Sequence, residues 1–327
     1  MKVKMLNAQA VRRLLPIERC VQLMRKAMLL VAHEATLQPI RTSLRLPDGK
    51  GLLSLMPGYT VDPRWLGIKV VSVFPENFGS DRGSHQGAVL LFEPEHGSLV
   101  AIVDGREITA IRTAAATAIA TDALAKPDAS TLAILGYGEQ AHMHVQSLVL
   151  VRQIKRILVW GRDFAKAKRF SEWAAAQTGA RVEAVREARV AVTEADVICT
   201  TTAAHEPVLE GKWLHAGQHL NVVGSSVPTT AEVDDEAVAR CRVFADFKDS
   251  ALQLAGELRR ARQAGVVGED HILGSVGEVL AGRIVGRSTD SDITMFKSLG
   301  MICEDLVAAD FILRESEQQE VGSFVEW

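Results

Sequence analysis

One stretch, residues 131–162, constrains the fold of this chain more than any other. An apolar run at 131–135 ends in glycine, as a buried parallel strand does, and a second apolar run lies at 156–160. Between them, a G-x-G-x-x-A turn at 136–141 leads into a segment of helical period at 142–151. This strand–helix–strand pattern predicts a dinucleotide-binding unit. The alternative is an ordinary strand–helix turn that happens to contain glycines.

Each small residue of the turn has a physical role in that prediction. Gly136 permits the tight turn, Gly138 lets backbone N–H groups approach a pyrophosphate, and Ala141 lets the helix pack close to the strand. The start of the helix then offers unpaired N–H groups and the positive end of a dipole to the phosphates.

The chain on either side of this unit shows two further kinds of pattern. Residues 42–103 hold short β-like runs separated by turn residues, which predicts a largely antiparallel sheet. Beyond residue 162, strand-like and helical stretches alternate, which predicts a doubly wound parallel sheet of the α/β class. The expected strands there are 181–185, 197–202, 219–223 and 242–245, and the expected helices are 108–124, 251–264, 277–281 and a final helical region at 295–316.

Composition excludes several classes of protein. The 327 residues are 47% hydrophobic, enough for two domains or one large one, and the net charge of −3 implies no general affinity for nucleic acid or anionic membranes. The first residues do not resemble a signal peptide, and no apolar run is long enough to span a bilayer. The four scattered cysteines have no zinc spacing, and we expect buried free thiols, no metal site and a cytoplasmic protein.

Three basic residues stand where a cation is costly. Lys69 lies in a strand too apolar to carry a lysine casually, Arg45 lies in or at the end of another strand, and Arg112 begins an alanine-rich segment. If the three converge, they make a site for a carboxylate-bearing substrate. The alternative is a set of unrelated surface ion pairs, and the pattern alone does not decide between them.

Several runs resemble the ornithine cyclodeaminase/mu-crystallin family. They are SHQGAVLLFEP at 84–94, DGREITAIRTAA at 104–115, the glycine turn, NVVGSS at 221–226 and FKSLGM at 296–301. The resemblance implies a dimerisation and substrate domain built from both chain ends, 1–118 and 302–327, and a Rossmann domain at 119–301. It also implies that Arg45, Lys69 and Arg112 bind the carboxylate of a small imino or amino acid, and it implies a homodimer.

The resemblance covers enzymes of more than one activity. Cyclodeaminases carry an aspartate where this chain has Ser226, and a serine cannot pair with an ammonium as a carboxylate does. The ketimine reductases of the family resemble this chain better, so we expect reduction of a cyclic imine carboxylate, with Lys69 supplying the proton. His85 is the competing donor, or merely a loop histidine. Cyclodeamination, alanine dehydrogenation and a non-catalytic binding protein stay as alternatives.

The choice of cofactor depends on the end of the second strand. Arg162 falls where a 2′-phosphate would lie, and Asp163 is expected to cap the helix at 164–174, so NADPH is predicted, with NADH as the alternative. The predicted cofactor site comprises Thr113, Gly136, Gly138, Glu139, Gln140, Ala141, Arg162, Thr201 and Gly224.

Overall fold

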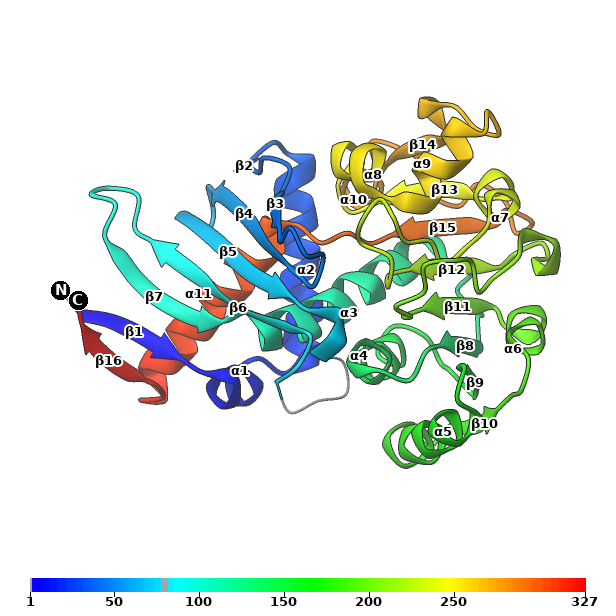
Figure 1. The fold of residues 1–327 in the computed structure, drawn as a ribbon, viewed down its shortest axis with the longest axis horizontal. Coiled ribbons are helices and arrows are strands. Elements are labelled where there is room, and N and C mark those ends of the chain that lie inside the picture. Colours follow the sequence, from blue (N-terminus) through cyan, green and yellow to red (C-terminus); the bar gives the residue numbers. More distant parts are fainter. Residues whose placement is uncertain (1, 78–81) are drawn as a thin grey trace. The chain divides into compact units, whose positions relative to one another are not determined.

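The computed structural model describes residues 2–77 and 82–327, and the chain folds into two compact units. Unit 1 comprises Met1–Arg112 and Met301–Trp327, and unit 2 comprises Thr113–Gly300. Figure 1 gives the labels of the elements. Among the described residues, no helix combines the length and the apolar character that crossing a bilayer requires.

Unit 1 is built on one mostly antiparallel sheet, as predicted. Its strand order is β16-β1-β7-β6-β5-β4-β2, with β3 paired to β4, and among the described strands of this sheet only β1 and β7 run parallel. The strands are β1 (Lys2–Leu6), β2 (Thr36–Leu37), β3 (Thr42–Arg45), β4 (Leu52–Thr60), β5 (Trp65–Val73), β6 (His85–Phe92), β7 (Leu99–Asp104) and β16 (Ser323–Glu326). The helices are α1 (Ala8–Leu14), α2 (Ile17–Ala32), the first part of α3 (Gly105–Leu124) and α11 (Ile302–Gln318).

Two glycines set how closely α11 approaches this sheet. Helix α11 lies against β4, β5 and β6, and α2 packs on α11. Gly58 and Gly67 are register partners on β4 and β5. A Cβ at Gly58 would stand 2.3 Å from Ile302, and one at Gly67 would stand 2.4 Å from Leu306. The missing side chains therefore let the first turns of α11 rest directly on the strands.

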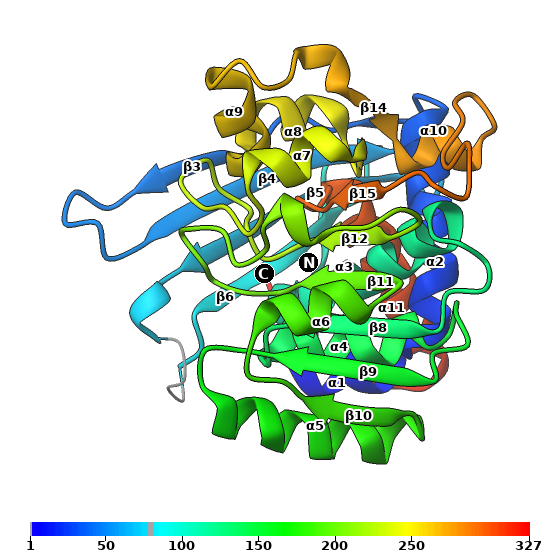
Figure 2. The same ribbon diagram turned by 90° about the vertical axis from the view of Figure 1, so that its right-hand side faces the viewer.

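Unit 2 is a parallel sheet of the Rossmann type (Figure 2), which confirms the predicted fold class. Its strand order is β10-β9-β8-β11-β12-β15-β13-β14, so the order reverses between β8 and β11. The strands are β8 (Thr131–Leu135), β9 (Arg156–Trp160), β10 (Arg181–Ala184), β11 (Val197–Thr200), β12 (His219–Val222), β13 (Arg242–Ala245), β14 (Ile272–Ser275) and β15 (Thr294–Lys297). The helices are α4 (Glu139–Leu148), α5 (Phe164–Thr178), α6 (Ala188–Glu194), α7 (Asp235–Arg240), α8 (Lys248–Leu254), α9 (Gly256–Gln263) and α10 (Val276–Leu280).

Alternate residues of the parallel strands supply two apolar layers. On β8, Leu132 and Ile134 pack with α4 and α5, whereas Ala133 and Leu135 pack with α6, α7, α8 and α9. Helices therefore cover both faces of the sheet, as a buried parallel sheet requires.

Two predicted helices differ from the structure. The final helical region was expected to begin at 295, but residues 294–297 form strand β15 between β12 and β13, and the helix begins at Ile302. All four residues of β15 are buried, so the strand lacks the alternation that marks a one-sided strand. The expected helix at 251–264 is two helices, α8 and α9, with Ala255 between them in an extended conformation.

Candidate active site

Lys69 lies in the middle of the unit 1 sheet and faces α11. It follows Gly67 by two positions on β5, so the two residues share the face that α11 covers. The Lys69 side chain is 3% exposed, and its Nζ lies 3.1 Å from each carboxylate oxygen of Asp305, on the first turns of α11. Lys69, whose burial the sequence predicted to be energetically costly, thus forms a buried ion pair with Asp305.

Arg112, on α3, binds the same carboxylate. Its Nε lies 3.1 Å from Oδ1 of Asp305, and its Nη1 lies 2.8 Å from Oε2 of Glu304. Glu304 and Asp305 are both fully buried, and Arg112 is 3% exposed. Two cations and two carboxylates therefore form one buried cluster, which we call the α11 cluster: Lys69, Arg112, Glu304 and Asp305.

The α11 cluster changes the protonation of Lys69. The pKa of Lys69 is lowered to about 8, chiefly by burial and then by the positive charges of Arg112 and Arg41. Asp305 opposes them, because its charge and its hydrogen bonds favour the ammonium. A lysine in this state can give up or take a proton near neutral pH.

The third cation beside Lys69 is Arg41 rather than the predicted Arg45. Across the sheet, Arg45 pairs with Leu52, which pairs with Val73, whereas Lys69 pairs with Met56, four positions away. Four residues of strand span about 13 Å, and Arg45 is exposed. Arg41 continues β3 toward the row of Met56 and Lys69 and is half-buried, and its charge, unlike that of Arg45, is among those that act on Lys69. We therefore replace Arg45 by Arg41 in the candidate site.

His85 lies in the same distant row as Arg45. It pairs with Val73 at the start of β6, it is exposed, and its Nδ1 lies 3.0 Å from the hydroxyl of Ser84. The position opposite Lys69 on β6 is Val89, four residues further on. The register therefore favours Lys69 over His85 as the group that moves a proton.

The sequence analysis missed Glu304, Asp305 and Arg41. A signal for the two acids was present, because they stand directly before an apolar run at 306–309, and burial of that helix start would require a cation for each. The same reasoning that singled out Lys69 would have found them. Arg41 offered no comparable signal, because it lies in a polar segment before a short exposed strand.

In unit 2 the predicted dinucleotide turn lies at the carboxyl end of β8. Gly136 has a φ of +133°, and a Cβ there would stand 2.5 Å from the hydroxyl of Thr201, which follows the neighbouring strand β11. Gly138 is the N-cap of α4, and within the described part of the chain no side chain caps this helix end. A Cβ on Gly138 would meet open space. The free N–H groups, the open approach and the position at the strand-order reversal fit a dinucleotide pyrophosphate.

The other predicted cofactor residues surround this edge in different ways. Glu139 and Gln140 begin α4, and the buried side-chain oxygen of Gln140 has no hydrogen-bond partner among the described residues. Ala141 is fully buried against the sheet. Thr113 lies on α3 directly after Arg112 and is 8% exposed.

A buried carboxylate ties together the loops that follow β11 and β12. Glu232 accepts hydrogen bonds from the backbone N–H of Thr202 at 2.6 Å and from that of Gly224 at 2.6 Å. Ser225 is buried and binds Glu257 and Lys297, whereas the predicted substrate residue Ser226 is only half-buried. Hydrogen bonds to Glu232 thus anchor the loop that carries Gly224 and Ser226. This loop lies at the same edge of the sheet as the dinucleotide turn.

The end of β9 carries the groups that decide between the two nicotinamide cofactors. Asp163 caps α5, as predicted, by accepting a hydrogen bond from the N–H of Lys166 at 3.0 Å. This bond is the largest influence on the carboxyl and lowers the pKa of Asp163. Arg162 is exposed beside it, and the guanidinium of Arg186, which follows β10, lies 4.2 Å from the ring centre of Phe164.

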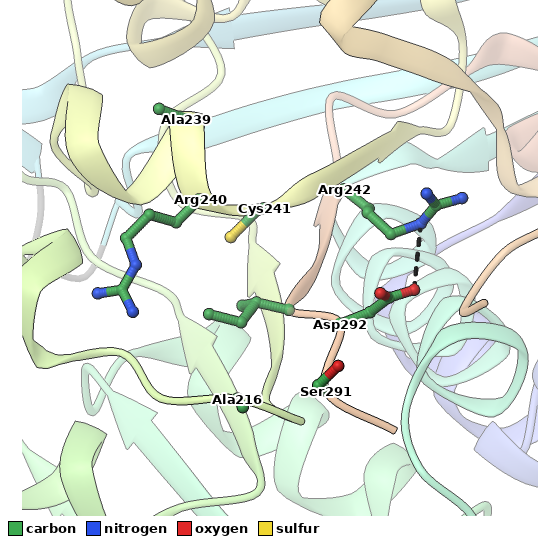
Figure 3. Close-up of a pocket in the computed structure, with 8 residues that line it drawn as sticks. Ala216, Ala239, Arg240, Cys241, Arg242, Ser291 and Asp292 are labelled. Carbon is green, nitrogen blue, oxygen red and sulfur yellow. Dashed lines mark ion pairs between the residues drawn. The ribbon is translucent and has the colours of Figure 1, made fainter. Parts of the chain in front are cut away.

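A pocket of about 460 Å³ lies elsewhere in unit 2 (Figure 3). Its lining residues precede or begin β12, β13 and β15, so it opens at the amino edge of the sheet and not at the edge of the glycine turn. In its lining, Nε of Arg242 lies 3.4 Å from Oδ2 of Asp292. No predicted site residue lines this pocket.

Similarity to known proteins identifies the family of this chain. The model of the ornithine cyclodeaminase/mu-crystallin family matches residues 1–320. The chain belongs to this family. The Δ1-pyrroline-2-carboxylate reductase of Bacillus cereus is 32% identical over 323 residues, which are 98% of this chain and 99% of the relative. The ketimine reductase mu-crystallin of Mus musculus is 38% identical over 276 residues, 84% of each chain.

A solved structure matches the fold over nearly the whole chain. The Δ1-pyrroline-2-carboxylate reductase of Thermococcus litoralis, in complex with NADH and L-proline, superposes with a TM-score of 0.96. It is 31% identical, and the match covers 99% of this chain and 100% of that one. These comparisons confirm the predicted family, the Rossmann fold and the enzyme class: the chain is an oxidoreductase of the class to which these reductases belong.

Proposed function

We propose that this enzyme reduces a cyclic ketimine carboxylate, Δ1-pyrroline-2-carboxylate or Δ1-piperideine-2-carboxylate, to L-proline or L-pipecolate with NAD(P)H. The α11 cluster is the observation that carries the proposal. It presents Lys69 and Arg112, with Arg41 close by, and so offers cations to a carboxylate and an ammonium to an imine nitrogen. Similarity to reductases that act on such imines supports the same substrate class.

The mechanism assigns separate tasks to the cations. Arg112 and Arg41 bind the substrate carboxylate, which fixes the ring in one orientation. A reduced nicotinamide supplies the hydride when it is bound. Lys69 donates a proton from Nζ to the imine nitrogen as the carbon accepts the hydride, so the C=N double bond becomes a C–N single bond. The neutral Lys69 amine then regains its proton from solvent.

Ser226 favours this reaction over cyclodeamination. The hydroxyl of Ser226 stays un-ionised at neutral pH and brings no charge to pair with the amino end of ornithine. A planar imine ring has no such amino end and needs no anion there. Alanine dehydrogenation is the second candidate, because it needs the same carboxylate cradle and also runs through an imine.

We propose NADPH as the preferred cofactor. Asp163 is engaged with the N-terminus of α5, and Arg162 and Arg186 stand at the ends of adjacent strands, so cations outnumber anions where a 2′-phosphate would lie. We expect Arg162→Ala to lower kcat/KM for NADPH about tenfold and to leave NADH almost unaffected. A wild-type preference for NADH would refute this part of the proposal.

We also propose a homodimer in the cytoplasm. The unit 1 sheet exposes Leu44, Leu53 and Leu66, with Leu44 69% exposed, and a second copy would cover such side chains. The four cysteines are buried free thiols, which suits a reducing compartment. Light scattering that shows an active monomer at micromolar concentration would contradict the dimer.

The direct test is an oxidation assay with NADPH and NADH against a panel of substrates. The panel contains the five- and six-membered imines, pyruvate with ammonia, and ornithine. We expect the cyclic imines to be reduced with the highest kcat/KM. Rapid conversion of ornithine to proline without imine reduction would overturn the proposal.

A further inference from the structure

Asp305 occupies a special position in the α11 cluster. Both of its oxygens lie 3.1 Å from the Lys69 ammonium, and one of them also accepts a hydrogen bond from Nε of Arg112. Its neighbour Glu304 is equally buried, but Glu304 binds Arg112 and the backbone N–H of Met301 at the start of the helix. Asp305 is thus the carboxylate shared by the two cations that the proposed mechanism uses.

The way Asp305 holds Lys69 leaves one donor available. An ammonium has three N–H bonds, and among the described residues its acceptors are the two oxygens of Asp305. A purely structural lysine at this depth would need a third acceptor, because an unpaired buried donor is costly. The remaining N–H of Lys69 is therefore the one that can donate a hydrogen bond to a substrate.

We propose that Asp305 is a positioning residue for the proton transfer, which aims the Lys69 ammonium at the imine nitrogen and holds Arg112 against the substrate carboxylate. This inference rests on the proposed function and names a residue to which that function assigns no role. The step stays balanced: Nζ of Lys69 loses one proton, the imine nitrogen gains it, and the hydride that reduces the carbon oxidises the nicotinamide. Asp305 stays ionised throughout.

The charges that face Lys69 make this role measurable. Arg112 on α3 and Arg41 before β3 both lower the pKa of Lys69, as does burial, and Asp305 raises it. Glu304 lies behind Arg112, and the Cys20 thiol of α2 adds no charge because burial raises its pKa well above the usual range. Without Asp305, the remaining influences all favour the neutral amine.

The test compares Asp305→Asn with Glu304→Gln in the complete enzyme with NADPH. Donation needs protonated Lys69, so kcat/KM falls as pH rises through the pKa of this lysine. We expect Asp305→Asn to move this alkaline limb down by about one pH unit or more and to lower kcat. Glu304→Gln is the matched control, and it should raise the KM of the imine without moving the limb. Titration of the imine substrate affects the pH profile of every variant equally, so it does not contribute to the difference between variants.

A conservative variant separates positioning from folding. Asp305→Glu keeps the charge and displaces it by one methylene, so we expect a lower kcat with the alkaline limb in its wild-type place. An unmoved limb in Asp305→Asn, or equal shifts in Asp305→Asn and Glu304→Gln, would overturn the inference. If Asp305→Asn does not fold, Asp305→Glu decides alone, and a wild-type kcat in that variant overturns the inference.

Ligand binding distinguishes failure of the inference from failure of the proposed function. Pyrrole-2-carboxylate is a planar ring carboxylate that cannot undergo the reaction, and calorimetry measures its affinity between pH 6 and 10. We expect its affinity to fall at high pH, and to fall at lower pH in Asp305→Asn than in Glu304→Gln. If no imine is reduced but this difference appears, the proposed function is wrong, and only the part of the inference in which Asp305 keeps the Lys69 ammonium charged and in place for a bound carboxylate holds. If imines are reduced but the difference is absent, only the role of Asp305 is wrong.

Discussion

Lys69 of unit 1 and Lys297 of unit 2 are both buried beside a carboxylate, and the structure holds them differently. The ammonium of Lys297 donates to the backbone oxygen of Ser225, to the Ser225 hydroxyl at 2.7 Å and to Glu257 at 2.9 Å. Lys69 has acceptors on one residue alone among those described, Asp305. Three acceptors satisfy all three N–H donors of the Lys297 ammonium, which gives it a structural role. Two acceptors leave one N–H donor of Lys69 available to a ligand. Counting acceptors thus separates two lysines that burial cannot distinguish.

The largest expected effect comes from removing the cation that both carboxylates of the α11 cluster share. We expect Arg112→Ala to lower kcat/KM for the imine by roughly two to three orders of magnitude, mostly through KM, because truncating one partner of a buried charge pair costs about 2–5 kcal/mol. Steady-state kinetics measure this effect, and cofactor affinity measured by fluorescence should stay near the wild-type value. Near-normal kinetics of Arg112→Ala would show that the α11 cluster takes no part in substrate binding or catalysis.

A paired substitution tests the comparison of the two lysines directly. We expect Lys297→Met to lower the free energy of unfolding by roughly 3–5 kcal/mol, because it leaves Glu257 buried without its cation. Lys69→Met should cost less stability, since Asp305 keeps Arg112, but it should abolish most of kcat. Urea unfolding and turnover of the two variants check this contrast, and a reversed pattern would mean that acceptor number does not report function.

The two units should also respond to pH in different ranges. In unit 2, burial lowers the pKa of His144 to about 4 and that of His219 to about 3. Both are neutral in the folded chain, so their contribution to stability is complete above pH 6.5 and is lost as the pH falls from there toward 3. At pH 5 the loss is roughly 2 kcal/mol for each histidine. For Lys69 the folded pKa is also lowered, so its contribution rises between about pH 8 and 10.5.

Unfolding curves at several pH values check this difference. Nδ1–H of His144 donates to the Gln140 carbonyl and Nε2 lies 3.0 Å from the Thr117 hydroxyl, so His144→Gln keeps polar contacts without the titration. We expect this variant to lose less stability between pH 7 and 5 than the wild type does. An equal loss in the two proteins would place the acid sensitivity elsewhere.

The smallest predicted effect concerns Arg41, the cation that lies close to the α11 cluster. We expect Arg41→Ala to raise the KM of the imine about tenfold, which is the usual contribution of one hydrogen bond to a charged group. Arg45→Ala, four residues along the same polar segment, should leave the KM within about twofold of the wild type. Equal effects of the two substitutions would show that the register argument misplaces the third cation.

The sequence allowed the parallel sheet and the glycine turn to be predicted because they depend on local patterns. Apolar runs, a helical period and small residues at fixed spacing are all visible within residues 131–162. Strand β15 could not be predicted in the same way. Its four residues are buried on both sides, and their place between β12 and β13 is set by pairing with segments about 50 to 75 residues away.

The candidate site was predictable one residue at a time but not as a set. Lys69 and Arg112 were visible because an apolar surrounding makes a cation conspicuous. Their partners Glu304 and Asp305 lie some 190 to 240 positions away, and the packing of α11 on the sheet, close over the glycine pair, brings them together. The prediction named Arg45 where the register of the sheet favours Arg41, because that choice depends on strand register, which no local pattern specifies.

The order of strands has a consequence for how the chain is made. β15 lies inside the unit 2 sheet, and the unit 1 sheet needs α11 on its face and pairs β1 with β16. A ribosome that has added residue 290 has delivered most of both units, yet each sheet still exposes unpaired strand edges. Both units therefore close only after β15, α11 and β16, which all follow residue 290, have been added. During that interval the exposed edges are open to pairing with other chains.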